Sequence, residues 1–135
     1  MKVFAVFDTN ILVSALISRR SDTAVVLALE ALLSGEVIPL YNDEILQEYD
    51  EVLHREKFNL PESLVDATIG QIKKDGIASE RIHTEESFPD STDIVFYEVA
   101  LSKDDSFLVT GNIKHFPKNP IVVTPSEFLR LIGKL

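Results

Sequence analysis

The chain has 135 residues, 45% of them hydrophobic and 26% charged, which predicts one folded domain over residues 1–135 and excludes a disordered chain. It contains no cysteine, so disulfides, thiolate metal sites and cysteine nucleophiles are excluded, and no apolar run approaches the ~20 residues of a membrane span. With 22 acidic against 13 basic residues, the formal net charge of -9 argues against tight non-specific binding to nucleic acid.

Strands and helices alternate along the chain. Short apolar runs bounded by glycine and proline predict strands at residues 3–7, 37–41, 107–109 and 121–123, with a further short strand at 81–83. Apolar periods of 3.6 residues predict helices at residues 10–17, 23–33, 43–55, 62–74, 92–102 and 126–131. The apolar strands lack polar alternation, so both faces of the sheet should be covered. This order predicts an α/β fold, a three-layer α/β/α sandwich around a central, mostly parallel sheet of four to five strands.

The first strand ends in three polar residues, Asp8, Thr9 and Asn10. In open α/β sheets, ligands bind in a crevice at the carboxyl ends of the strands. Two interpretations of Asp8 stay open. It holds a metal ion at the mouth of this crevice, or it caps the helix that follows.

A second acid lies in the helix predicted at residues 43–55. Its apolar residues form one stripe, and Glu48 falls on the border of that stripe, one turn from Ile45 and Val52. Glu44 and Glu51 lie farther toward solvent. Glu48 is therefore the acid of this helix that is best placed to face a crevice, although an acid beside a core stripe is also common in amphipathic helices.

Two further polar positions follow later in the chain. Asp93 falls in the first turn of the helix at residues 92–102, where an acid is also favourable against the helix dipole. The strand at residues 107–109 is followed by Thr110, Gly111 and Asn112, which repeats the layout at the end of the first strand. All these positions can face one crevice at the carboxyl end of the sheet.

Four segments in this order resemble the PIN domain, a family of metal-dependent ribonucleases. They are residues 7–10 (Phe-Asp-Thr-Asn), 45–53 (Ile-Leu-Gln-Glu-Tyr-Asp-Glu-Val-Leu), 90–96 (Asp-Ser-Thr-Asp-Ile-Val-Phe) and 108–117 (Leu-Val-Thr-Gly-Asn-Ile-Lys-His-Phe-Pro). The resemblance spans almost the whole chain and is strongest to a bacterial subgroup described as toxin components of toxin–antitoxin modules.

The resemblance implies a catalytic and metal-binding set. Asp8, Glu48 and Asp93 match the three family acids, and Asn112 falls where many members carry a fourth acid. An amide oxygen can still bind Mg²⁺ or Mn²⁺, but it leaves the site with three formal negative charges, which favours one firmly held ion. The residues implied to contact substrate are Thr9, Asn10, Thr110, Lys114 and His115.

The function implied is that of a Mg²⁺- or Mn²⁺-dependent endoribonuclease acting on RNA, with a cognate antitoxin and a homodimer as expected partners. The first apolar stretch lacks a signal-peptide cleavage pattern, so a cytoplasmic location without membrane contact is expected. The main alternative is a catalytically degenerate PIN-like domain that serves as a protein-binding or scaffold module, which the acidity and Asn112 favour.

Two other enzyme classes also place an acid after the first strand. A phosphohydrolase of the haloacid dehalogenase type needs a second Asp two residues on, where this chain has Asn10. A response-regulator receiver needs paired acids there and a lysine at the end of a late strand, but Lys114 lies beyond the turn. Both alternatives are therefore weaker than the nuclease interpretation.

Overall fold

The computed structural model of the protein describes residues 2–134. Five strands form one sheet in the order β3-β2-β1-β4-β5, and every neighbouring pair is parallel. The strands are β1 (Val3–Phe7), β2 (Val37–Tyr41), β3 (Ile77–Ala78), β4 (Ser106–Val109) and β5 (Val122–Val123). The central position of β1 explains its apolar sequence, because it has a partner on each side and helices over both faces.

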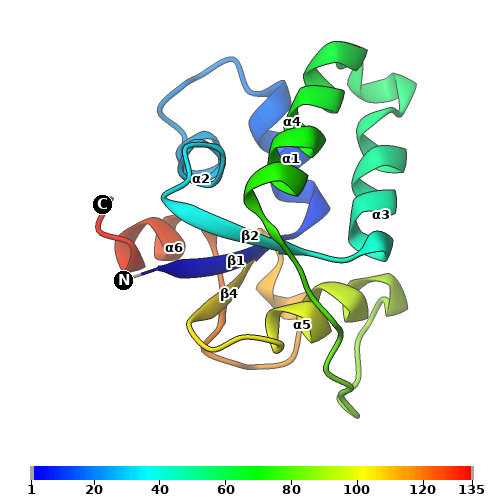
Figure 1. Cartoon of the computed structure of the whole chain (residues 1–135), viewed down its shortest axis with the longest axis vertical. Helices are drawn as coiled ribbons and strands as arrows, with labels where there is room; N and C mark the ends of the chain where they lie inside the picture. The colour runs from blue at the N-terminus through cyan, green and yellow to red at the C-terminus, as the bar shows by residue number, and fades with distance from the viewer. Residues whose placement is uncertain (1, 135) are drawn as a thin grey trace.

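Within residues 2–134, six α-helices and three short 3₁₀ helices accompany the strands, and the last of them, α6, follows β5. The α-helices are α1 (Thr9–Ile17), α2 (Ala24–Leu33), α3 (Asp43–Leu53), α4 (Glu62–Asp75), α5 (Ile94–Ala100) and α6 (Pro125–Leu131). The 3₁₀ helices are η1 (Glu56–Phe58), η2 (Ser91–Asp93) and η3 (Ile113–His115). In Figure 1, α1 to α4 lie above the sheet and α5 lies below it, while α6 packs against α2 and β4. The predicted three-layer α/β/α fold is confirmed. None of the helices within residues 2–134 is long and apolar enough to cross a membrane.

Side-chain caps explain where several helices begin. The Asn42 side chain accepts a hydrogen bond from the Ile45 amide at 2.9 Å and so caps α3. Thr124 and Glu127 form a reciprocal capping box at α6, with Pro125 in the first turn. The core between these elements contains large buried side chains, among them Phe7, which packs edge-on against Phe128 at a centroid distance of 6.1 Å.

The short strand predicted at residues 81–83 is wrong, because the fifth strand is β3, directly after α4. Gly76 allows this early return to the sheet: a Cβ there would lie 2.7 Å from the Pro39 carbonyl oxygen of β2. Arg81 and Ile82 are drawn instead toward α5, where the Arg81 Nε donates to Glu98 at 2.7 Å and the Ile82 amide donates to the Glu98 carbonyl at 3.0 Å.

The predicted helix at residues 92–102 also differs from the structure. It begins as the 3₁₀ turn η2, which Asp90 caps by accepting from the Thr92 amide at 2.9 Å, and continues as α5 only from Ile94. Asp93 therefore lies at the junction of two helix types instead of inside a regular first turn.

Candidate functional site

The polar ends of β1 and β4 lie side by side. These strands pair in parallel with Phe7 opposite Val109, so Asp8 and Thr110 emerge together at the carboxyl edge of the sheet. The Thr110 hydroxyl donates to Asp8 Oδ2 at 2.8 Å. Thr110 is fully buried and Asp8 is 6% exposed, so this hydrogen bond holds the carboxylate with little competition from water.

Asp8 occupies the position before α1, but its side chain forms no capping hydrogen bond there. Its carboxylate is directed to Thr110 instead. Asp8 is still the N-cap residue of α1, and hydrogen bonds with the backbone amides of Asn10 and Thr9 lower its pKa. Capping alone does not explain why this carboxylate is buried against Thr110, because burying its charge is costly.

Helix α3 brings Glu48 to the same edge. The side chain is half-buried and accepts a hydrogen bond from the hydroxyl of Thr9, the first residue of α1. The next residue, Tyr49, is buried, and its hydroxyl donates to the Phe7 carbonyl at 2.5 Å. The border position predicted for Glu48 therefore faces the end of β1, with two hydrogen bonds between the segments.

Asp93 reaches the site from η2. Its side chain is 15% exposed, and Oδ2 lies 3.7 Å from His115 Nδ1 of η3. Burial first, and then the negative charge of Asp8, raise the pKa of Asp93 to about 6. The charge of Glu48 acts in the same direction, whereas His115 opposes it.

The other two acids feel the same environment. Burial raises the pKa of Asp8, and the Thr110 hydrogen bond opposes that shift. Burial also raises the pKa of Glu48, with the charge of Asp8 adding to the effect and the Thr9 hydrogen bond opposing it. The charge of Asp8, which follows β1, thus acts on the carboxyls of Glu48 in α3 and Asp93 in η2. Perturbed acids gathered in this way are typical of functional sites.

The remaining predicted residues lie around this group. The backbone N–H of Asn112 donates to the Thr110 hydroxyl at 3.0 Å, so the backbone of Asn112 contacts the hydroxyl that holds Asp8. Asn10, Asn112, Lys114 and His115 are all exposed. The structure thus brings Asp8, Glu48 and Asp93 together and places the four exposed residues on the segments beside them.

Sequence reasoning missed a second group, which lies between the C-terminal end of α3 and α4. Asp50, His54 and Asp66 offer ligand atoms that all lie within 4.8 Å of one another, and all three residues are exposed. Within residues 2–134, Asp8, Glu48 and Asp93 do not reach this spacing. No sequence motif indicates this second group, because Asp66 belongs to α4 and lies close to Asp50 and His54 only in the folded chain.

An ion pair with one buried partner was also missed. Glu98 of α5 is 4% exposed and accepts from Arg81 Nε at 2.7 Å and from the Thr84 amide at 2.8 Å. The Arg81 guanidinium also donates to both oxygens of Glu44, at 3.0 and 2.9 Å. One arginine therefore links the helix that carries Glu48 to the helix that follows Asp93.

This fold and this acid-lined edge define an α/β domain of the class that keeps its polar site at the carboxyl ends of parallel strands. The family model of the PIN domain matches residues 5–114, a range that contains Asp8, Glu48 and Asp93. The chain therefore belongs to the PIN domain family. PIN domains are generally nucleases, and they typically use divalent metals. Searches among curated proteins and among solved structures gave no significant match.

Proposed function

We propose that this protein is a Mg²⁺- or Mn²⁺-dependent endoribonuclease that hydrolyses phosphodiester bonds of RNA at the edge formed by Asp8, Glu48 and Asp93. The observation that carries the proposal is the pair of hydrogen bonds by which Thr110 and Thr9 hold the Asp8 and Glu48 carboxylates at the carboxyl edge of the sheet. Asp93 lies beside His115 at the same edge. Burial raises the pKa of all three carboxyls, and neighbouring acids add to this for Glu48 and Asp93, so a bound cation would stabilise their ionised forms.

The donor set suits a hard divalent cation. Asp8, Glu48 and Asp93 offer carboxylate oxygens, and Asn112 offers an amide oxygen, which are the ligand types that Mg²⁺ and Mn²⁺ prefer. When bound, such a cation would activate water at neutral pH and stabilise charge on the phosphoryl oxygens.

The protein's own residues prepare the site for this chemistry. Thr110 orients Asp8, and Thr9 orients Glu48, so neither carboxylate has to be ordered when a ligand arrives. Lys114 and His115, on η3 beside Asp93, are proposed to contact the phosphate backbone. Asn10 lies in the first turn of α1 and is proposed to contact substrate there.

The decisive experiment compares the wild type with Asp8→Asn on single-stranded RNA, in Mn²⁺ and in EDTA. We expect cleavage by the wild type in Mn²⁺ only, and a loss on the order of 100-fold in the variant, the size typical of removing a group that stabilises transition-state charge. Asp50→Asn, in the exposed group at α3, is the matched control and should cleave as the wild type does. Equal cleavage by wild type and Asp8→Asn would overturn the proposal.

Two cheap assays separate the enzyme alternatives. A nuclease should turn over a coloured phosphate ester negligibly, whereas a phosphohydrolase of the haloacid dehalogenase type should hydrolyse it. A receiver domain should incorporate acetyl phosphate, and a nuclease should not.

The second candidate function is a catalytically degenerate PIN-like scaffold. The uncharged Asn112 and the formal net charge of -9 favour it. This candidate predicts no metal-dependent cleavage by the wild type on any RNA tested, together with retained binding of a protein partner by Asp8→Asn.

We further propose that the protein is a single-domain cytoplasmic toxin that pairs with an antitoxin and forms a homodimer. The support is the resemblance of the four segments to toxin components of toxin–antitoxin modules. Expression of the wild type should then arrest growth of a bacterial host, and expression of Asp8→Asn should not. Arrest by both variants would show that growth inhibition does not depend on the acid site.

A further inference from the structure

A depression of about 260 Å³ lies next to the candidate active site. Its walls come from η3, from the turn that follows and from β5. His115 of η3 faces Asp93, while Ile113, Lys114 and Phe116 of the same segment line the depression. One short 3₁₀ helix therefore contributes to both the acid group and the depression.

The depression is lined by the apolar side chains of Ile113 and Phe116, and other residues contact Phe116 and Asn119 from the protein side. Ile113 is 45% exposed and presents its side chain there, whereas Phe116 is buried and packs edge-on against Phe88 at 6.2 Å. Asn119, on the wall, donates to the Tyr97 hydroxyl at 3.0 Å and accepts from the Ile121 amide at 3.1 Å. With its walls held in this way, the depression can accept a flat apolar group without first reorganising.

Two lysines, Lys114 and Lys118, line the depression. Neither forms an ion pair with any residue in the range 2–134, whereas Arg81 and Lys134 are both paired with carboxylates. In a chain with a formal net charge of -9, these two lysines put positive charge beside an acidic site. The carboxylates of the acid group repel RNA phosphates over the ~8 Å of a Debye length at physiological salt, and positive charge beside them would offset this repulsion.

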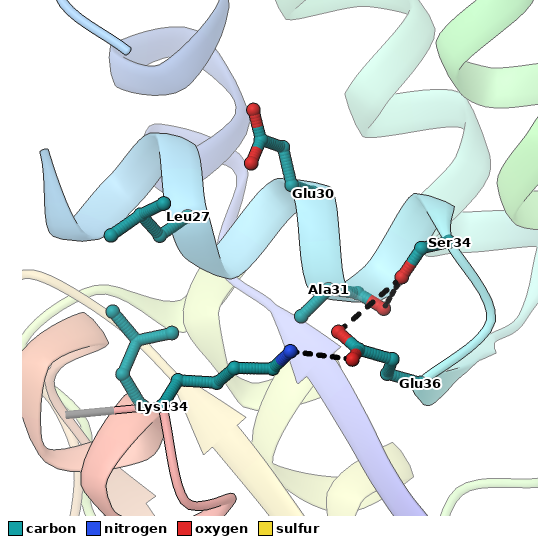
Figure 2. Close-up of a pocket in the computed structure, with 7 residues that line it drawn as sticks. Leu27, Glu30, Ala31, Ser34, Glu36 and Lys134 are labelled. Atoms are coloured by element: carbon teal, nitrogen blue, oxygen red, sulfur yellow. Dashed lines mark hydrogen bonds and ion pairs between the residues drawn. The ribbon is translucent and has the colours of Figure 1, made fainter. Parts of the chain in front are cut away.

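A larger depression of about 510 Å³ lies between α2 and α6 and serves as a comparison. Figure 2 shows Lys134 there, bonded to Glu36, with Glu30 on the neighbouring helix α2. Glu36 immediately precedes β2, so this depression is at the amino edge of the sheet, opposite the acid group. Its lysine is neutralised and its other charges are acidic, which makes it unsuited to a phosphate chain.

We propose that the depression beside η3 is a nucleotide subsite. It takes one unstacked base of the RNA strand against Ile113 and Val122, with neighbouring backbone phosphates at Lys114 and Lys118. Its volume is below the ~300–1,000 Å³ of sites for drug-sized ligands, which favours one base over a longer stretch. A base enters only if it is unpaired, so the subsite selects single-stranded over double-stranded RNA. This inference rests on the proposed ribonuclease function and names its substrate class.

The test is direct binding of a fluorescently labelled single-stranded RNA of eight to twelve nucleotides, measured by anisotropy in EDTA. Lys118→Ala should weaken binding about 3- to 10-fold and reduce the salt slope by about 1. Ile113→Ala should weaken binding by a similar factor, in line with the loss of a base contact. Lys134→Ala is the matched control from the other depression and should bind as the wild type does. A duplex of the same sequence should bind more weakly than the single strand.

Wild-type affinity in both Lys118→Ala and Ile113→Ala would overturn the subsite, as would an equal loss in Lys134→Ala. Absence of RNA binding by the wild type at low salt would also overturn it and would favour an acidic protein segment as the occupant. Because the assay contains no metal, it is independent of catalysis. Weakened binding in both variants together with no cleavage by the wild type would support the subsite and contradict the proposed nuclease.

Discussion

Helix α3 contributes to two groups of candidate metal ligands, through Glu48 in one and Asp50 in the other, and the two groups differ in burial more than in composition. The exposed group of Asp50, His54 and Asp66 has the tighter spacing and includes a histidine. Both of its aspartates are 64% exposed, so water already solvates their charges. A hydrogen bond with the Asp50 backbone carbonyl is the first cause that raises the pKa of His54, and the neighbouring acids add to it.

The group of Asp8, Glu48 and Asp93 is looser but largely withdrawn from water, and hydroxyls of Thr110 and Thr9 hold two of its members. Buried like charges raise the free energy of the ionised apo site, and a cation relieves that cost. The comparison teaches that burial and prepared hydrogen bonds mark a candidate cation site better than the proximity of ligand atoms does.

The test with the largest expected effect compares the RNA cleavage rates of variants at two glutamates of α3. Glu48→Gln should lower the cleavage rate on the order of 100-fold, because it removes one charge from the buried group. Glu51→Gln, three residues on and exposed, should leave the rate unchanged. Single-turnover cleavage of RNA in saturating Mn²⁺ measures both, and equal rates for the two variants would remove Glu48 from the site.

A smaller effect on activity is expected from a substitution at Thr110, whose hydroxyl donates to Asp8. Thr110→Val keeps the shape of the side chain but removes the hydroxyl that donates to Asp8. Loss of such an orienting partner typically costs about 10- to 100-fold in metal affinity or activity. The Mn²⁺ concentration for half-maximal cleavage should therefore rise about tenfold or more. An unchanged Mn²⁺ dependence would show that Asp8 is oriented without Thr110.

Metal binding should also raise the free energy of unfolding of the protein. At tenfold excess over the dissociation constant, Mn²⁺ or Mg²⁺ should stabilise the fold by about 1.4 kcal/mol, or roughly 3–6 °C in Tm for a domain of this size. The double variant Asp50→Asn with Asp66→Asn should keep the shift, and Asp8→Asn should lose it. A shift that disappears only in the double variant would assign the ion to the exposed group.

The smallest effect concerns the apo protein and its pH dependence. The pKa of Asp93 is about 6 in the fold against 3.8 for the unperturbed group, so between these values the folded state binds more protons than the unfolded state. Stability without metal should therefore fall as pH rises from about 4 to about 6, and Asp93→Asn should remove this part of the loss.

At pH 7 in EDTA, Asp93→Asn should consequently be more stable than the wild type by about 1 kcal/mol, after allowance for solvent screening. At pH 4 the two proteins should be equally stable. Urea denaturation at both pH values measures the difference. A variant that is less stable than the wild type at pH 7 would contradict the raised pKa of Asp93.

Much of the fold follows from local sequence patterns. Strands β1 and β2 have the residue ranges that their apolar runs predict, and the helical stripe of α3 directs Glu48 toward the sheet. These elements are predictable because burial on both faces of a strand, or on one face of a helix, leaves a periodic pattern. The resemblance added Asp93, whose local sequence alone indicates only a helix start.

The remaining features depend on partners far apart in the chain. The incorrect strand at residues 81–83 arose because Arg81 pairs with Glu44 and Glu98, which lie 37 and 17 residues away. Lys118 became notable only when the folded chain placed it on the same depression as Ile113. Neither feature leaves a periodic pattern, so sequence reasoning had no signal for them. The roles proposed for the acids remain predictions that the experiments above address.

The hydrogen bond from Tyr49 to the Phe7 carbonyl has a consequence for how this domain tolerates change. It joins the residue after one acid to the residue before another, so the separation of Asp8 and Glu48 is set inside the core. Loops elsewhere, such as the exposed connection at residues 19–22, can then lengthen or shorten without altering that separation. Tags or sensor peptides inserted there should leave the arrangement of the two carboxylates intact.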